Sequence, residues 1–118
     1  PHPKEFAQLL KLCDLGEYSV SDVVSNRLSL VRKFLRKYKN SALVLKGANV
    51  FIGYNDKVYV CTYGTQALSK GGSGDVLAGA IAGLLAQNYD VKDAAVTGVL
   101  MHALASKKIK DNLIIYLL

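Results

Sequence analysis

The residues best suited to chemistry form one short block, Lys70-Gly71-Gly72-Ser73-Gly74-Asp75, directly before an apolar, alanine-rich stretch. Neighbouring glycines let successive backbone N–H groups face one concavity, and the N-terminus of a following helix adds partial positive charge. Such a cradle suits a phosphate group or a developing oxyanion. Beside it, Asp75 has the position of a general base that takes a proton from a hydroxyl attacking a phosphoryl group. A tight turn in which Asp75 merely caps the helix is the structural alternative.

Two further segments carry groups that could face a ligand. Lys46-Gly47-Ala48-Asn49 directly follows an apolar run, and ligands gather at the carboxyl ends of strands in open α/β sheets, so this loop could line a nucleotide pocket. His2 stands between two prolines in Pro1-His2-Pro3, an extended segment that leaves its ring able to hydrogen-bond a ligand. A simple turn and a structural histidine are the alternatives.

Helices are predicted where apolar residues recur at intervals of three or four. The predicted helices are residues 6–13 ending before Gly16, a longer one from an N-cap at Ser21 or Asp22 to Tyr38, residues 76–85 after the glycine block, and residues 91–108 after a cap at Asp90. On the last helix, His102 is expected to be an interior or boundary residue.

Three apolar runs predict strands. Residues 42–45 are wholly apolar, as in a strand buried on both faces, which is typical of a parallel sheet. Residues 50–52 and 58–60 are rich in β-formers, and the polar residues between them predict a hairpin turn. Because no internal repeat or linker is visible, residues 1–118 are interpreted as one partial α/β domain.

Composition limits the class of protein. A chain of 118 residues with 51% hydrophobic and 20% charged residues has the size of one globular unit. No apolar run approaches the roughly 18 residues of a membrane-spanning helix, and no secretory pattern opens the chain, so we expect a cytoplasmic protein. Cys13 and Cys61 lack metal-ligand spacing and are interpreted as buried free thiols.

Positive charge is concentrated in one segment. The formal net charge is +6, and six of the 15 basic residues lie in residues 27–39. Such a surface could meet nucleic acid, a membrane or a small anion. Because no RNA-binding signature accompanies it, a solvated helix face is favoured, and nucleic-acid binding stays an alternative.

Three segments together resemble the NAD(P)H-hydrate dehydratase family, whose ribokinase-like fold is a three-layer α/β/α domain. The glycine-aspartate block within residues 67–79 is the most specific, although close variants occur in other ribokinase-like kinases. The segments that favour the dehydratase are Pro1-His2-Pro3-Lys4-Glu5-Phe6 and Leu45-Lys46-Gly47-Ala48-Asn49. The resemblance extends from Pro1 to about His102.

The resemblance implies repair of nicotinamide cofactors, namely removal of water from hydrated NADH or NADPH at the expense of ADP or ATP, with Mg²⁺. It implies that Asp75 is the catalytic base and that Gly72, Ser73 and Gly74 form an anion hole. It assigns the adenine nucleotide to Lys46, Gly47, Ala48, Asn49, Val50 and Gly74, and the hydrate to His2 and Asp75. We expect no metal ligand from the protein and neither a nucleic-acid nor a membrane partner. We do expect a homo-oligomer.

The sequence also departs from the family. Lys4 stands where members usually have glycine, and residues 103–107 replace a Gly-x-Ala-Gly-Asp continuation after His102. Members carry further strands of the sheet before the Pro-His-Pro segment. The chain is therefore expected to be the C-terminal half of such a domain, with an altered end at the apolar residues 113–118.

Two other functions stay open besides nucleic-acid binding. A ribokinase-like kinase of a vitamin precursor would use the same anion cradle and base but release a stable phosphate ester. An inactive fragment, which serves only as an assembly partner, would expose an open strand edge and apolar surface.

Overall fold

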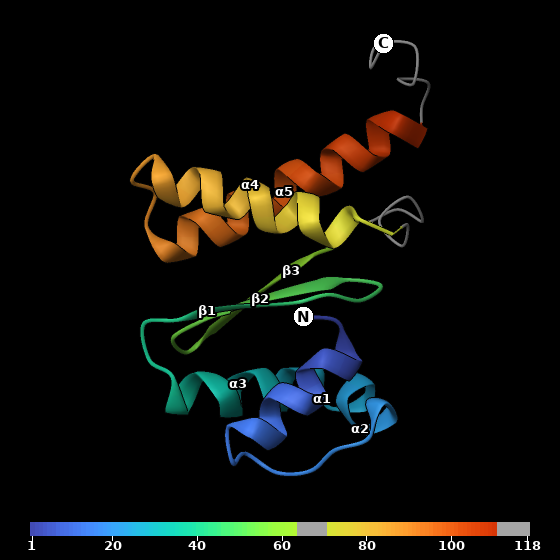
Figure 1. Ribbon diagram of the computed structural model, residues 1–118, viewed down its shortest axis with the longest axis vertical. Coiled ribbons are helices and arrows are strands. Elements are labelled where there is room, and N and C mark those ends of the chain that lie inside the picture. The colour runs from blue at the N-terminus through green and yellow to red at the C-terminus, as the bar shows by residue number, and fades with distance from the viewer. Residues whose placement is uncertain (64–70, 111–118) are drawn as a thin grey trace. The chain divides into compact units, whose positions relative to one another are not determined.

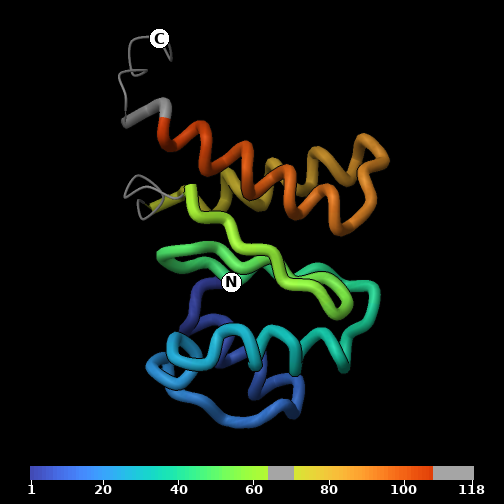
Figure 2. Tube along the Cα trace, turned by 180° about the vertical axis from the view of Figure 1, so that it is seen from behind, coloured from blue at the N-terminus to red at the C-terminus, as the bar shows by residue number. Residues whose placement is uncertain are grey.

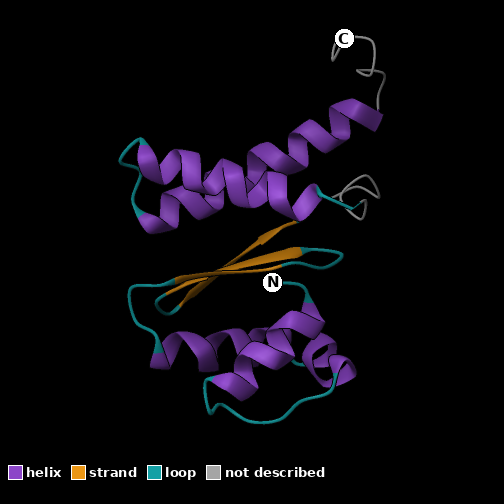
Figure 3. Ribbon diagram, in the orientation of Figure 1, coloured by secondary structure: helices purple, strands orange, loops and turns teal. Residues whose placement is uncertain are grey.

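The computed structural model describes residues 1–63 and 71–110 of the chain, with side chains as far as residue 107. The chain divides into two compact units, residues 1–60 and residues 61–118. The three strands all begin in the first unit (Figure 3). Lys70 of the glycine block and the apolar residues 113–118 lie outside the described residues.

The first unit opens with three helices, α1 (Pro3–Leu12), α2 (Val20–Ser25) and α3 (Arg27–Lys37). The prediction of one long helix up to Tyr38, capped by Ser21 or Asp22, is wrong. Ser19 is the cap of α2, since its Oγ accepts from the Asp22 N–H at 3.0 Å and its own N–H donates to the Asp22 carboxylate at 2.9 Å. Asn26 then separates α2 from α3, since its φ of −127° and ψ of 33° are not helical. Its backbone N–H and its side-chain amide both donate to the Asp22 carbonyl, at 3.0 Å and 2.9 Å.

A sheet with the strand order β1-β2-β3 follows, formed by β1 (Ala42–Leu45), β2 (Val50–Tyr54) and β3 (Lys57–Cys61). The hairpin between the last two strands is confirmed, with Asn55 in a left-handed turn conformation at φ 54°. The parallel pairing expected for β1 is wrong, since β1 pairs antiparallel with β2. The loop between them is too short for the crossover that a parallel pair requires.

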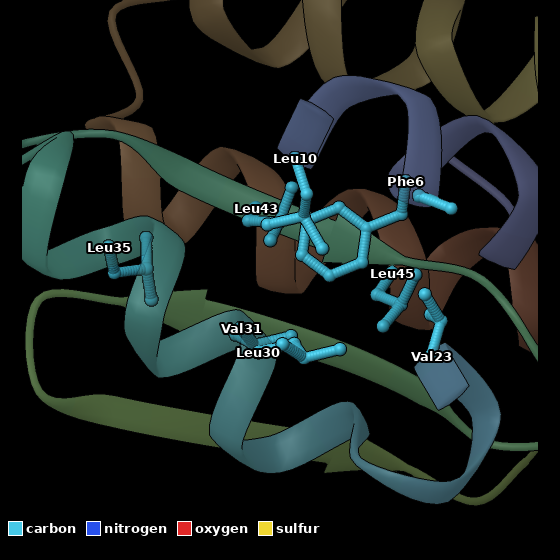
Figure 4. Packing of buried hydrophobic residues seen from close by; sticks show 9 residues of the cluster. Phe6, Leu10, Val23, Leu30, Val31, Leu35, Leu43 and Leu45 are labelled. Atoms are coloured by element: carbon cyan, nitrogen blue, oxygen red, sulfur yellow. The ribbon is translucent and has the colours of Figure 1, made fainter. Parts of the chain in front are cut away.

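Most buried side chains of the first unit form one cluster between the helices and one face of the sheet (Figure 4). Phe6 of α1 is fully buried and contacts Phe34 edge to face, with ring centroids 6.1 Å apart. The cluster explains the alternation in β1, whose Leu43 and Leu45 are buried while the residues beside them are half-buried. Its members are Phe6, Ala7, Leu10, Val23, Leu30, Val31, Leu35, Leu43 and Leu45.

The second unit contains α4 (Ser73–Ala86) and α5 (Val91–Lys110), which lie side by side in both views (Figures 1 and 2). The predicted cap of α5 is confirmed, because the Asp90 carboxylate accepts from the Asp93 N–H at 2.7 Å. Ala95, Val99 and Ala103 form a buried stripe on α5. His102 is half-buried, as expected for a boundary residue.

The helices and sheet confirm the α/β class predicted from the sequence. Both cysteines are free thiols. Cys61 is buried as predicted, whereas Cys13 is only half-buried, because it lies at the exposed C-terminal end of α1. Among the described residues, no helix is both long enough and apolar enough to span a membrane.

Candidate functional site

The glycine block forms the N-terminus of α4, as the sequence predicts. Gly72 is the N-cap, and its φ of 86° and ψ of −13° place it in the left-handed region that favours glycine. Its carbonyl accepts from the Val76 N–H at 3.2 Å and so begins the helical hydrogen-bond ladder. Gly72 has no side chain that could cap α4. The backbone N–H groups of the first turn therefore point out of the helix end and receive no side-chain acceptor from the N-cap residue.

Asp75 lies in this first turn and is exposed to solvent. The alternative in which Asp75 serves as the helix cap is excluded, since the cap is Gly72 and makes no side-chain hydrogen bond. Its carboxylate has no hydrogen-bond or ion-pair partner among the described residues, unlike that of Asp93, which pairs with Lys92 at 3.2 Å. Asp75 is therefore available to accept a proton from a ligand.

The Lys46–Val50 segment, which we call the β1–β2 loop, joins the ends of two paired strands. Gly47, Ala48 and Asn49 are exposed, while Lys46 is half-buried and Val50 is already the buried first residue of β2. The exposed part thus offers main-chain groups and a short amide side chain to a ligand. The side chain of Val50 faces the protein interior instead.

Arg27 contacts both ends of this loop, which no pattern in the sequence indicates. Its Nη2 donates to the Leu45 carbonyl at 3.2 Å and to the Asn49 carbonyl, and its guanidinium carbon lies 4.0 Å from the centroid of the Phe51 ring. Burial lowers the pKa of the Arg27 guanidinium, which nevertheless stays charged at any physiological pH. Sequence reasoning assigned Arg27 only to a basic helix face, because its acceptors lie 18 and 22 residues away in the chain.

His2 is the N-cap of α1. Its Nδ1 accepts from the Glu5 N–H at 3.3 Å, and the Glu5 carboxylate accepts from the His2 N–H at 2.8 Å and lies 3.2 Å from the ring Nε2. These capping hydrogen bonds, above all the one from the His2 N–H, lower the pKa of Glu5. The ring is about half exposed, so it has a structural role and also one face open to solvent.

The structure brings two of the predicted segments together. The Lys46 N–H donates to the Pro1 carbonyl at 2.8 Å, which joins the Pro-His-Pro segment to the β1–β2 loop although 45 positions separate them in the chain. Both belong to the first unit, whereas the Gly72–Asp75 turn belongs to the second. The candidate residues thus form two groups, one in each unit.

The chain was compared with known proteins. The family model described as NAD(P)H-hydrate dehydratase matches residues 1–118. The chain is 47% identical over 112 residues to the bifunctional NAD(P)H-hydrate repair enzyme Nnr of Helicobacter pylori, a match that covers 95% of this chain and 24% of that protein. It is 37% identical over 113 residues to the ADP-dependent (S)-NAD(P)H-hydrate dehydratase of Neisseria meningitidis, covering 95% of this chain and 36% of that protein.

Solved structures agree. A crystal structure of the ADP/ATP-dependent NAD(P)H-hydrate dehydratase of Bacillus subtilis, co-crystallised with ATP and Mg²⁺, superposes with a TM-score of 0.81 at 28% identity. The match covers 95% of this chain and 38% of that one. The chain thus spans between a quarter and two fifths of the relatives named here. A family model that matches every residue shows that this chain belongs to the NAD(P)H-hydrate dehydratase family.

Proposed function

We propose that this chain carries the phosphate-binding turn, the catalytic base and the nucleotide loop of an enzyme that dehydrates hydrated NADH or NADPH at the expense of ADP or ATP. The observation that carries the proposal is the N-terminus of α4, where an exposed carboxylate, Asp75, stands in the first turn behind the left-handed Gly72. Both the family and the solved relatives, one of which was crystallised with ATP and Mg²⁺, support it.

The chemistry follows from the two kinds of group in this turn. Asp75 accepts the proton of the hydroxyl on the hydrated ring while the hydroxyl oxygen attacks the terminal phosphorus of the nucleotide. The bond from that phosphorus to the bridging oxygen breaks, which leaves the shortened nucleotide and a phosphate ester of the hydrate. The carbon–oxygen bond of the ester then breaks, inorganic phosphate leaves, a proton is lost from the neighbouring ring carbon, and the double bond of the reduced ring is restored.

Main-chain amides are the proposed stabilisers of the transferring phosphoryl group. The N–H groups of Gly72, Ser73 and Gly74 lie at the N-terminus of α4, where the helix dipole adds partial positive charge. Donors fixed in advance around a developing negative charge lower the barrier without having to reorganise. A Cβ on Gly72 would meet no atom within 4 Å, so the space beside this residue is open.

The β1–β2 loop and the Pro-His-Pro segment are the proposed contacts of the two ligands. Lys46, Gly47, Ala48, Asn49 and the backbone of Val50 would hold the adenine nucleotide, together with Gly74. His2 would contact the hydrated dinucleotide through the open face of its ring. Its neighbour Lys4, where the family usually has glycine, is exposed.

Mg²⁺ fits this set of groups as a companion of the nucleotide. The described residues contain no cluster of three or more histidine, cysteine, aspartate or glutamate side chains that could hold a metal ion. Mg²⁺ commonly keeps several waters and binds mainly through substrate phosphates, so it needs no such cluster. When bound, it would neutralise phosphate charge. The proposal also includes a cytoplasmic location and a homo-oligomeric state, the latter testable by light scattering.

The test uses the chain and a chimaera. In the chimaera, the 112 matching residues of the Helicobacter pylori repair enzyme are replaced by those of this chain, so that the rest of a dehydratase is supplied. Each protein is given hydrated NADH, Mg²⁺ and either ADP or ATP. We expect the chimaera to restore the near-ultraviolet absorbance of NADH and to release inorganic phosphate in equal amounts, and the chain alone to show little turnover.

Product analysis decides between this and the neighbouring functions. If a phosphorylated small alcohol accumulates with ATP while hydrated NADH is left untouched, the chain is a kinase and the dehydratase assignment fails. If the chimaera folds and binds nucleotide but turns over neither substrate, the chain is an inactive member of the family. Robust turnover by the isolated chain would contradict the expectation that further residues are required.

A further inference from the structure

The guanidinium of Arg27 lies behind the β1–β2 loop and contacts both of its ends. One nitrogen, Nη2, donates to the carbonyl of Leu45, the last residue of β1, and to the carbonyl of Asn49, the last residue before β2. The exposed residues Gly47 and Ala48 lie between these two points. A single cation thus closes the loop across its base.

These contacts also fix the orientation of peptide groups. In a planar trans peptide the carbonyl and the N–H point in opposite directions. The Leu45 carbonyl accepts from Arg27 on one side, and the Lys46 N–H of the same peptide donates to the Pro1 carbonyl at 2.8 Å on the other. The first peptide group of the loop is therefore held at both ends, and the Asn49 contact turns the N–H of Val50 away from Arg27.

No other described group competes for this cation. Arg27 forms no ion pair with an acidic side chain among the described residues, and its Nε is shielded from solvent without an acceptor there. Its flat face instead stacks on Phe51, 4.0 Å from the ring centroid. Because a buried donor without an acceptor is costly, the two loop carbonyls that accept from Nη2 stabilise the guanidinium at this place.

Gly47 is adapted to the same contact. A Cβ at position 47 would lie 2.9 Å from Nη2 and 3.1 Å from the guanidinium carbon of Arg27. Any larger residue would thus push the guanidinium away from the carbonyls that it binds. The close approach explains glycine at a position whose backbone conformation does not require it.

We infer that Arg27 is a positioning residue for adenine-nucleotide binding, because it holds the β1–β2 loop in the conformation that receives the nucleotide. The inference rests on the proposed function of that loop. Arg27 itself lies behind the loop and acts through the main chain of residues 45–50. Its removal frees the loop before any ligand arrives, so the nucleotide must then supply the ordering.

The matched pair of variants is Arg27→Met and Arg32→Met, made in the full chain. Both remove one positive charge from α3, but Arg32 is exposed and contacts neither end of the loop. Arg27→Lys is the third variant, since it keeps the charge and loses the planar group that stacks on Phe51. For each, hydrogen exchange of the Lys46 amide and the affinity for ADP and ATP are measured.

We expect Arg27→Met to accelerate exchange of the Lys46 amide and to weaken nucleotide binding by about tenfold to a hundredfold, the range for losing hydrogen bonds to a charged donor. Arg32→Met should leave both unchanged, and Arg27→Lys should lie between. Amides of α1 should exchange as in the parent chain, which separates loop release from unfolding.

Two results would overturn the inference. Unchanged Lys46 exchange in Arg27→Met means that Arg27 does not position the loop, and this readout needs no nucleotide. Faster exchange with unchanged nucleotide affinity means that the positioning does not serve binding. If the parent chain and the chimaera bind neither ADP nor ATP, the nucleotide function fails, while the exchange data still decide whether Arg27 holds the loop.

Discussion

Helices α4 and α5 begin in different ways although both carry an aspartate at the third helical position. In α5 the Asp90 carboxylate accepts from the Asp93 N–H at 2.7 Å, and Asp93 itself pairs with Lys92. In α4 the cap is the left-handed Gly72, which offers no side chain, and Asp75 is exposed without a described partner. The N-terminus of α5 thus has a side-chain cap, whereas the N-cap of α4 makes no side-chain hydrogen bond.

The difference shows that an aspartate at the third helical position can accompany either a side-chain cap, as in α5, or a glycine cap, as in α4. A side-chain cap stabilises a helix by roughly 1 kcal/mol. α4 has no such side-chain cap, and we propose that the amides of its first turn bind a phosphoryl group. Among the other helices, α1 and α2 begin with complete capping boxes, whereas α3, like α4, has no side-chain cap hydrogen bond.

The comparison is tested most strongly by replacing the two equivalent aspartates in the chimaera. Asp75→Asn should lower kcat by about 10²–10⁴-fold, since it removes a general base while keeping the shape of the side chain. Asp93→Asn, at the same position of α5, should change kcat by less than about twofold. Steady-state rates of NADH recovery give both values, and equal losses in the two variants would show that Asp75 has no special role.

The left-handed cap of α4 gives the next largest effect. Gly72→Ala should destabilise the chain by about 1–2 kcal/mol, because a Cβ is disfavoured at φ 86° and no neighbour within 4 Å could compensate. Gly71→Ala is the control, since its Cβ would also meet nothing and its φ is not in that region. Urea denaturation followed by circular dichroism measures both, and similar stabilities would argue against the left-handed cap.

Removing the cap of α5 should have a smaller effect, confined to stability. Asp90→Ala should cost about 1 kcal/mol, because the Asp93 N–H loses its acceptor. The same change leaves the N-terminus of α4 untouched, so kcat of the chimaera should stay as in the parent. A fall in kcat comparable to that of Asp75→Asn would mean that the two helix ends do not have separate roles.

The smallest effect is a dependence of stability on pH in the first unit. Capping hydrogen bonds lower the pKa of Glu5 below its ordinary 4.5 and that of Asp22 below its ordinary 3.8. Their contribution is therefore complete above these values and is lost as the pH falls below them. Denaturation midpoints from pH about 6 to about 3 should decline less in Glu5→Gln than in the parent; parallel curves would contradict this.

Much of the fold could be predicted from the sequence because its signals are local. The hairpin, the cap of α5 and the glycine-initiated α4 each depend on a few neighbouring residues, such as Asp90 before an apolar helix. The division of the second predicted helix could not be foreseen from periodicity, since the hydrophobic pattern runs on through Asn26. The interruption lies in the backbone of Asn26, whose φ of −127° and ψ of 33° are not helical.

The candidate site shows the same boundary between local and distant interactions. Asp75 and the glycines around it could be identified because their chemistry lies in consecutive residues. Arg27 could not, because its role depends on the return of β1 and β2 to the start of α3. Arg27 is one of six basic residues within residues 27–39. It is half-buried and the other five are exposed, but the spacing of the six in the sequence does not show this difference.

The hydrogen bond from the Lys46 N–H to the Pro1 carbonyl has a thermodynamic consequence. This hydrogen bond joins the Pro-His-Pro segment to the β1–β2 loop. A ligand that orders one of these segments therefore reduces the conformational entropy that the other must still lose when it becomes ordered. By thermodynamic linkage the effect is mutual. If the adenine nucleotide raises the affinity for the dinucleotide by some factor, the dinucleotide raises the affinity for the adenine nucleotide by the same factor.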